Sequence, residues 1–156
     1  MFSADRSQRS GLQSQHAGRE DFGLGGRGAI IILLDSDEDC PAELGPGLLA
    51  RATTTRSDIV ISVTVAKHEY GSWFLAAAES FDESALSSDY AVAEDPEAIS
   101  GAKERLRDPA TGRRYSPTID QPAFTRIMSL ASARRARSFD RFYREVERLL
   151  RQARQN

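Results

Sequence analysis

The stretch that decides the fold is Ala29-Ile30-Ile31-Ile32-Leu33-Leu34, followed at once by Asp35-Ser36-Asp37-Glu38-Asp39. The first part is continuously apolar and rich in β-branched side chains, which favours a strand. Because its apolar residues do not alternate with polar ones, both faces of this strand should be covered, as in a central strand of a parallel sheet. The acidic second part then marks the carboxyl end of a buried strand.

Strand and helix patterns alternate along the rest of the chain. A second strand is expected over residues 59–65. Helices are expected to begin at Pro41 and to cover residues 69–81, 96–107 and 138–153. Gly45-Pro46-Gly47 is expected to kink the first helix or delay its start. Asp95 and Ser138 are the expected N-caps of the last two helices, and residues 112–122 indicate a turn-rich connection. This order predicts an α/β fold with a small, mostly parallel sheet, flanking helices and a helical C-terminal part.

The chain has 156 residues, which is enough for one domain with its own core. Residues 1–28 are rich in Ser, Gln, Gly and Arg and are expected to form a disordered tail before a domain over residues 29–156. The longest apolar run, residues 29–34, is far too short to span a bilayer, so no membrane association is expected. The single cysteine, Cys40, excludes an internal disulfide and favours a cytoplasmic location.

Charge is distributed unevenly along the chain. Residues 1–100 contain 7 Lys and Arg against 17 Asp and Glu, whereas residues 101–156 contain 14 against 6. One interpretation is that an acidic half holds metal and a basic half holds phosphate. The other is that the two halves simply attract each other, with the arginines on solvated helix faces. The sequence favours the two interpretations equally.

The acidic loop has the chemistry of a site for a hard divalent cation. Asp35, Asp37 and Asp39 alternate, so in an extended segment their side chains point the same way. Like charges at this spacing repel unless they are protonated, solvated or bridged by a cation. Carboxylate oxygens suit Mg²⁺ or Mn²⁺, and Mg²⁺ typically takes one or two carboxylates together with waters and substrate phosphates. The alternative is an acidic turn that only solubilises a strand end.

Polar residues also follow the second strand at its carboxyl end, namely Lys67, His68 and Glu69. If the two strands are neighbours, Glu69 lies beside the aspartates as a further ligand or catalytic group, and Lys67 or His68 contacts a phosphate. The alternative is that Glu69 only favours the N-terminus of the next helix and that His68 is solvated. Further candidate phosphate contacts are Lys103, Arg113 and Arg114.

Several motifs together resemble one bacterial family. They are Ile31-Ile32-Leu33-Leu34-Asp35-Ser36-Asp37-Glu38-Asp39-Cys40-Pro41, His68-Glu69-Tyr70, Trp73-Phe74-Leu75, Gly101-Ala102-Lys103-Glu104, Tyr115-Ser116-Pro117, Asp120-Gln121-Pro122 and Ser138-Phe139-Asp140-Arg141-Phe142. In this combination the chain is similar, over about residues 29 to 150, to the Toprim-like family catalogued as domain of unknown function four-two-seven-six.

The resemblance implies a topoisomerase-primase type α/β fold that binds Mg²⁺ and acts on phosphodiesters. It implies that Asp35 and Asp37 are metal ligands, supported by Asp39 and Glu69. It also implies an AAA or ABC-type ATPase as a partner, since relatives occur beside such ATPases in genome-defence operons. Toprim sites further use a glutamate that ends a first strand. No apolar strand precedes Glu20 or any other early acid, so this strand and its glutamate are expected to be absent.

Three functions therefore compete. The first is a Mg²⁺-dependent, nuclease-like domain that acts on nucleic acid. The second is a non-catalytic partner subunit of an ATPase, motivated by the missing glutamate, the charge asymmetry and the amphipathic last helix. The third is a phosphatase-like or nucleotidyl-transfer enzyme of the haloacid-dehalogenase type. The third is disfavoured, because its nucleophile loop needs a small hydroxyl or β-branched residue where Asp39 stands.

Overall fold

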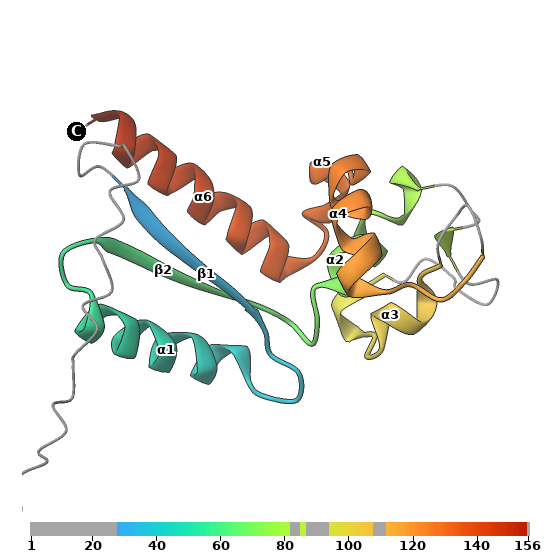
Figure 1. The fold of residues 1–156 in the computed structure, drawn as a ribbon, viewed down its shortest axis with the longest axis horizontal. Helices are drawn as coiled ribbons and strands as arrows, with labels where there is room; N and C mark the ends of the chain where they lie inside the picture. The colour runs from blue at the N-terminus through green and yellow to red at the C-terminus, as the bar shows by residue number, and fades with distance from the viewer. Residues whose placement is uncertain (1–27, 82–84, 87–93, 108–111, 156) are drawn as a thin grey trace, which may run out of the picture.

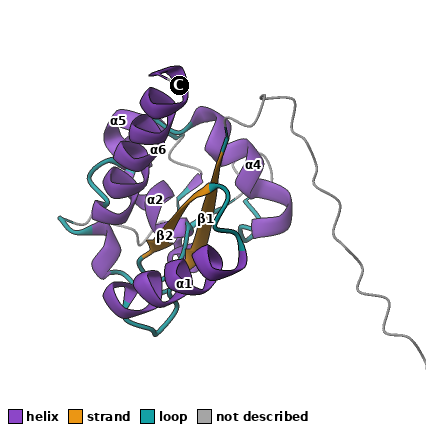
Figure 2. Cartoon of the chain, turned by 90° about the vertical axis from the view of Figure 1, so that its left-hand side faces the viewer, coloured by secondary structure: helices purple, strands orange, loops and turns teal. Residues whose placement is uncertain are grey.

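The computed structural model describes residues 28–81, 85–86, 94–107 and 112–155. Two parallel strands, β1 (Ala29–Asp35) and β2 (Val60–Ala66), form the sheet. The helices α1 (Pro41–Thr55) and α6 (Arg137–Gln155) lie on opposite sides of these strands, as Figures 1 and 2 show from two directions. The predicted α/β class, with a small parallel sheet, flanking helices and a helical C-terminal part, is confirmed.

The remaining described helices are short and gather at one end of the sheet (Figure 1). They are α2 (Gly71–Ala76), η1 (Ala78–Ser80), η3 (Pro96–Ala98), α3 (Ala102–Arg105), α4 (Pro117–Ile127) and α5 (Leu130–Ala133). Of the tail predicted over residues 1–28, residues 1–27 lie outside the described part of the chain.

Each face of the sheet meets one helix. Val65 of β2 points at α1, because a Cβ built on Gly45 of that helix would lie 3.6 Å from the Val65 side chain. On the opposite face, the Ser62 hydroxyl hydrogen-bonds Glu145 of α6. That face of β2 carries the small residues Ser62, Thr64 and Ala66, which leave room for the helix. The residues of β1 are half-buried or exposed and none is fully buried, so the expectation of a buried central strand covered on both faces is wrong: β1 is one of only two strands in the sheet that the structure describes.

Helix α1 begins at Pro41, the predicted position, although Gly45-Pro46-Gly47 lies in its first half. Pro41 occupies the first turn, where its missing N–H needs no partner. The helix then continues to Thr55 with Pro46 inside it, so the predicted delay of its start does not occur.

The segment predicted as one helix over residues 69–81 is shorter than expected and more deeply buried. Helix α2 ends at Ala76, and the short η1 turn follows it. Every residue of α2 is buried, so the segment is the centre of the core rather than an amphipathic helix with one apolar face. The Trp73 and Phe74 rings pack against aromatic rings from later elements, namely Tyr115, Phe124, Phe139 and Phe142.

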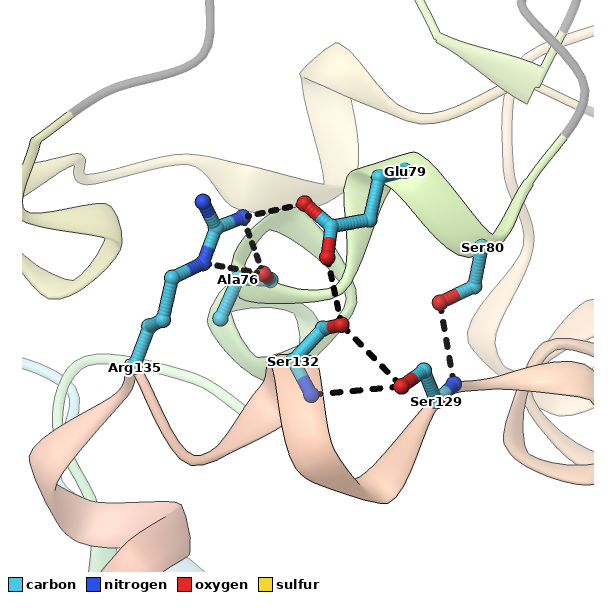
Figure 3. A network of polar contacts seen from close by, with 6 residues as sticks. All are labelled: Ala76, Glu79, Ser80, Ser129, Ser132 and Arg135. Carbon is cyan, nitrogen blue, oxygen red and sulfur yellow. Dashed lines mark hydrogen bonds and ion pairs between the residues drawn. The ribbon is translucent and has the colours of Figure 1, made fainter.

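A polar network joins α5 to the end of α2, as Figure 3 shows. Arg135 donates two hydrogen bonds to the Ala76 carbonyl and forms an ion pair with Glu79 at 3.7 Å. The Ser132 hydroxyl donates to Glu79 at 2.5 Å, and Ser129 caps α5 by accepting the Ser132 N–H at 3.2 Å. The network satisfies a terminal carbonyl of α2, which is one reason that the helix can end inside the protein.

The helix predicted over residues 96–107 divides into two pieces. Asp95 is the N-cap as predicted and accepts the Glu97 N–H at 3.0 Å, but the capped turn ends at Ala98. Gly101 follows with φ of +71°, a left-handed conformation that glycine adopts without strain, and α3 begins after it. The expected continuous helix is therefore wrong.

The turn-rich connection predicted over residues 112–122 is wrong in its second half. Helix α4 begins at Pro117, where a proline in the first turn is tolerated, and it contains Pro122. Two closely spaced prolines therefore lie in a helix that the sequence pattern had assigned to a turn.

Helix α6 is capped by a carboxylate from another element rather than by the predicted Ser138. Glu97 is only 2% exposed, and its carboxylate accepts the N–H groups of Arg137 at 2.8 Å and of Ser138 at 3.1 Å. The Ser138 hydroxyl also donates to Glu97, and it accepts the Trp73 Nε1–H at 2.7 Å. The Glu97 carboxylate and the Ser138 hydroxyl thus connect η3, α2 and the start of α6.

We expect Glu97→Ala to lower the free energy of unfolding by about 2 kcal/mol, because it removes a buried carboxylate that accepts the partly buried N–H groups at the start of α6. The measurement is urea unfolding followed by circular dichroism. The matched control is Glu94→Ala, which removes an exposed carboxylate close by in the sequence and should change stability little. Equal stabilities of the two variants would contradict the capping role.

Candidate metal centre

The two strands end at the same edge of the sheet, and hydrogen bonds continue their pairing into the loops. The Ser36 N–H donates to the Ala66 carbonyl, and the Asp37 N–H donates to the His68 carbonyl, both at 2.9 Å. The His68 N–H in turn donates to the buried Ser36 hydroxyl at 2.9 Å. The loop after β1 and the loop after β2 therefore form one hydrogen-bonded unit, which places the predicted site residues of both loops at one edge.

The backbone of this unit is unusual at two facing positions. Asp37 has φ of +48° and His68 has φ of +60°, and among the described residues these are the positive-φ positions that are not glycine. The two residues contact each other, since His68 Nδ1 lies 3.2 Å from the Asp37 carbonyl oxygen. Left-handed backbone is unfavourable for residues with a Cβ, and it occurs often at functional sites, where surrounding contacts maintain it.

Asp35 is the carboxylate at the centre of the edge. It accepts the Tyr70 N–H at 2.8 Å. Although the residue reaches solvent, protein atoms around the carboxyl group desolvate it, and this raises the pKa of Asp35. The negative charges of Asp37 and Glu69 raise this pKa further, whereas the Tyr70 N–H and the Lys103 charge lower it. Asp35, Asp37 and Glu69 are therefore close enough to interact electrostatically.

Glu69 is placed by the close packing of α2 against α3. Its Oε1 accepts the Lys103 N–H at 3.4 Å. A Cβ added at Gly71 would lie 3.2 Å from the Ala102 Cβ, so a side chain at this position would push the two helices slightly apart. Lys103 thereby reaches the acidic edge, although it is 34 residues away from Glu69 in the chain.

The loop after β1 is a turn rather than the extended segment in which its aspartates would share one direction. The Asp39 N–H donates to the Ser36 carbonyl at 2.8 Å, which closes the turn. Asp37, Glu38 and Asp39 are all exposed. Among residues 28–81, 85–86, 94–107 and 112–155, no three His, Cys, Asp or Glu side chains are grouped closely enough to hold a metal ion. Cation binding by Asp35, Asp37 and Asp39 stays a prediction.

The predicted phosphate contacts are in different environments. Lys67 and His68 follow β2 directly, and Lys103 lies beside Glu69. Arg113 instead donates to both carboxylate oxygens of Asp120, at 2.9 and 2.6 Å, and lowers the pKa of that acid. Its guanidinium is therefore paired at the start of α4.

Arg114 is exposed, and its carbonyl accepts a hydrogen bond from Arg113 at 3.1 Å. The geometry therefore groups Lys67, His68 and Lys103 near the acidic edge, and it shows a structural role for Arg113.

Two tyrosines complete the surroundings of the acidic edge, and sequence reasoning had assigned neither to it. The Tyr70 hydroxyl lies 3.2 Å from Thr125 Oγ1, and its ring packs on Trp73. Burial of Tyr115 raises the pKa of its phenol, and nearby negative charges, Asp35 and Glu69 among them, raise it further. Tyr70 follows Glu69 directly and could have been suspected, whereas no local signal places Tyr115 here.

Comparisons of the chain with protein-family models, with curated proteins and with solved structures each found no match. Within the described segments, no helix has both the length and the apolar character that crossing a bilayer requires.

We expect Asp35→Asn to raise the free energy of unfolding at pH 7 in the presence of EDTA, because the substitution removes an unfavourable negative charge. The expected gain is only about 0.5 kcal/mol, because solvent screens a partly exposed charge. The pKa of Asp35 is raised in the folded protein, so its contribution to stability is largest below the ordinary value of 3.8 and is lost as pH rises above it. The measurement is urea unfolding at pH 3 and at pH 7.

The stabilisation by Asp35→Asn should therefore disappear at pH 3. The control is Asp39→Asn, which removes an exposed carboxylate of the same turn. Destabilisation by Asp35→Asn at pH 7 would show that the ionised carboxylate is favoured in the folded state, contrary to this expectation.

Proposed function

We propose that this chain binds Mg²⁺ or Mn²⁺ at the carboxyl ends of β1 and β2 and uses the cation to act on nucleic-acid phosphodiesters. The observation that carries the proposal is the electrostatic interaction of Asp35 with Asp37 and Glu69 across the end of the sheet. A bound cation would relieve this repulsion. The resemblance to the Toprim-like family supports the same chemistry, because the motifs that carry it include both loops.

The roles follow from the positions of the side chains. Asp35 and Asp37 are the proposed ligands, and Mg²⁺ needs only one or two carboxylates when waters and phosphate oxygens complete its shell. Asp39 and Glu69 support the site as further negative charges. Glu69 is also the proposed proton acceptor or donor. Lys103, whose charge already acts on Asp35, is proposed to contact the phosphate, with Lys67 and His68 beside it.

We expect isothermal titration calorimetry to detect Mg²⁺ or Mn²⁺ uptake by the wild-type chain and a loss of at least about ten-fold in affinity for Asp35→Asn. Mg²⁺ at ten times the wild-type Kd should stabilise the wild-type chain by about 1.4 kcal/mol and Asp35→Asn by no more than about 0.4 kcal/mol. The control is Glu43→Gln, an exposed acid in the first turn of α1. Equal heats from all three proteins would reject the metal centre.

The nucleic-acid part of the proposal has its own measurement. Fluorescence anisotropy with a labelled single-stranded 20-mer should show tighter binding with Mg²⁺ than with EDTA, and weaker binding as salt rises. Strand cleavage on a denaturing gel is followed in parallel, with Asp35→Asn as the inactive variant. Binding that is insensitive to both Mg²⁺ and Asp35→Asn would leave only a non-specific basic surface.

A second function, that of a partner subunit of an AAA or ABC-type ATPase, is favoured by a different observation. Six large apolar side chains are exposed in the described part of the chain, and three of them belong to α4 and α5: Ile119, Ile127 and Leu130. Co-expression with an ATPase encoded beside this chain should give a complex on size exclusion. The Ile119→Glu/Ile127→Glu variant should dissociate it, and a wild-type chain that elutes alone would exclude that partner.

A further inference from the structure

The second strand has one edge without a partner in the described structure. The Ser36 N–H donates to the Ala66 carbonyl, so Ala66 and every second residue before it direct their backbone groups at β1. Ile61, Val63 and Val65 must then direct their N–H and C=O groups away from β1. Lys67 fits this alternation, because its N–H points out to the Ser138 hydroxyl at 3.4 Å.

In the part of the chain that the structure describes, no hydrogen bond reaches the outward backbone groups of Ile61, Val63 and Val65. Buried backbone groups nearly always have partners, and an open strand edge is a template for another strand. Val65 is buried and Val63 is half-buried, so this edge of β2 is partly shielded from solvent although it pairs with no described strand.

The edge opens into a cavity of about 470 Å³, a size typical of ligand pockets. Val63 and Val65 form its floor, and Pro46 and Leu49 of α1 form an apolar wall. The opposite wall belongs to η3 and the first turns of α6, where Arg137 and Arg141 line the cavity, and Lys67 closes one end. The cavity therefore runs beside the unpaired edge, between the two helices that cover the sheet.

The charged groups of the cavity leave a surplus of positive charge. Its two acids are already used within the chain, since Asp95 caps η3 and Glu97 caps α6. The side chains of Lys67, Arg137 and Arg141 form no ion pair with any carboxylate of the described residues. An occupant with negative side chains would meet all three cations.

We propose that this cavity is a docking site for an extended, acidic segment of a partner protein, which pairs with β2 as an added strand. Strand addition explains the unpaired alternate amides, and the cations select acidic side chains on the segment. A nucleic-acid strand would use the cations but not the backbone groups or the apolar wall. The site differs from the proposed metal centre because it involves the side edge of β2 rather than its end, and Lys67 is the residue that borders both.

The test uses fluorescein-labelled peptides of four Val-Glu repeats, measured by anisotropy on the full chain. The parent peptide should bind, and the same peptide with Lys in place of Glu should bind at least about ten-fold more weakly. Two further peptides carry N-methyl groups on all Val or on all Glu residues. Only alternate amides of an added strand face β2, so one of these peptides should lose binding and the other should keep it.

Arg141→Glu should weaken binding of the parent peptide by at least about five-fold, because it reverses an exposed charge at the cavity. Arg154→Glu, an exposed arginine near the far end of α6, is the matched control and should bind as the wild type does. Urea unfolding confirms that both variants are folded. Binding by Arg141→Glu that equals the control would overturn the proposal.

Other results would also overturn it. Failure of the parent peptide to bind, or equal binding by both N-methylated peptides, would exclude strand addition. Competition by a single-stranded 20-mer that depends on Arg141 would assign the cavity to nucleic acid. Concentration-dependent self-association that Arg141→Glu abolishes would assign it to a second copy of the chain. None of these readouts depends on Mg²⁺, so the metal centre and the docking site can fail independently.

Discussion

The hydrogen-bonded pairing of β1 and β2 is the constraint on which the candidate site depends. It does not stop at the last strand residue, because Ser36 and Asp37 remain bonded to Ala66 and His68. This extension draws Asp37 and His68 into left-handed backbone and fixes the direction in which both loops leave the sheet. The carboxylates at the edge are therefore held near one another by backbone geometry rather than by their own interactions, which are repulsive.

The basic residues of the C-terminal part of the chain are in two different environments. Several arginines of α6 pair with acids of the same helix, as Arg148 does with Glu145 at 2.5 Å and Arg151 with Glu147 at 3.3 Å. These pairs agree with the simpler interpretation of solvated, self-compensating helix faces. Arg137 and Arg141, at the start of the same helix, differ because they line a cavity and their side chains form no ion pair with a carboxylate of the described residues. The functional interpretation therefore rests on position along α6 rather than on total charge.

Sequence patterns predicted those elements whose surroundings are uniform along their length. The apolar run of β1 and the amphipathic stripe of α6 were recognisable because β1 is half-buried along most of its length and α6 keeps one apolar face. The short helices were not recognisable from the sequence. Every residue of α2 is buried, so α2 has no polar face, and the left-handed Gly101 interrupts the chain between η3 and α3. In the site, strand order placed Asp35 and Glu69 at one edge, whereas Lys103 and Tyr115 arrive through tertiary packing that no local pattern encodes.

The single tryptophan of the chain lies where three elements meet. Trp73 is fully buried, it stacks near Phe139 and Phe142 of α6, and its indole N–H is bonded to Ser138. Because no second indole contributes, the intrinsic fluorescence of the protein reports the docking of α6 without any label. Undocking of α6 from the sheet would expose the indole to water and shift its emission maximum to longer wavelength. Changes confined to the acidic edge would leave the indole buried and the emission maximum unchanged.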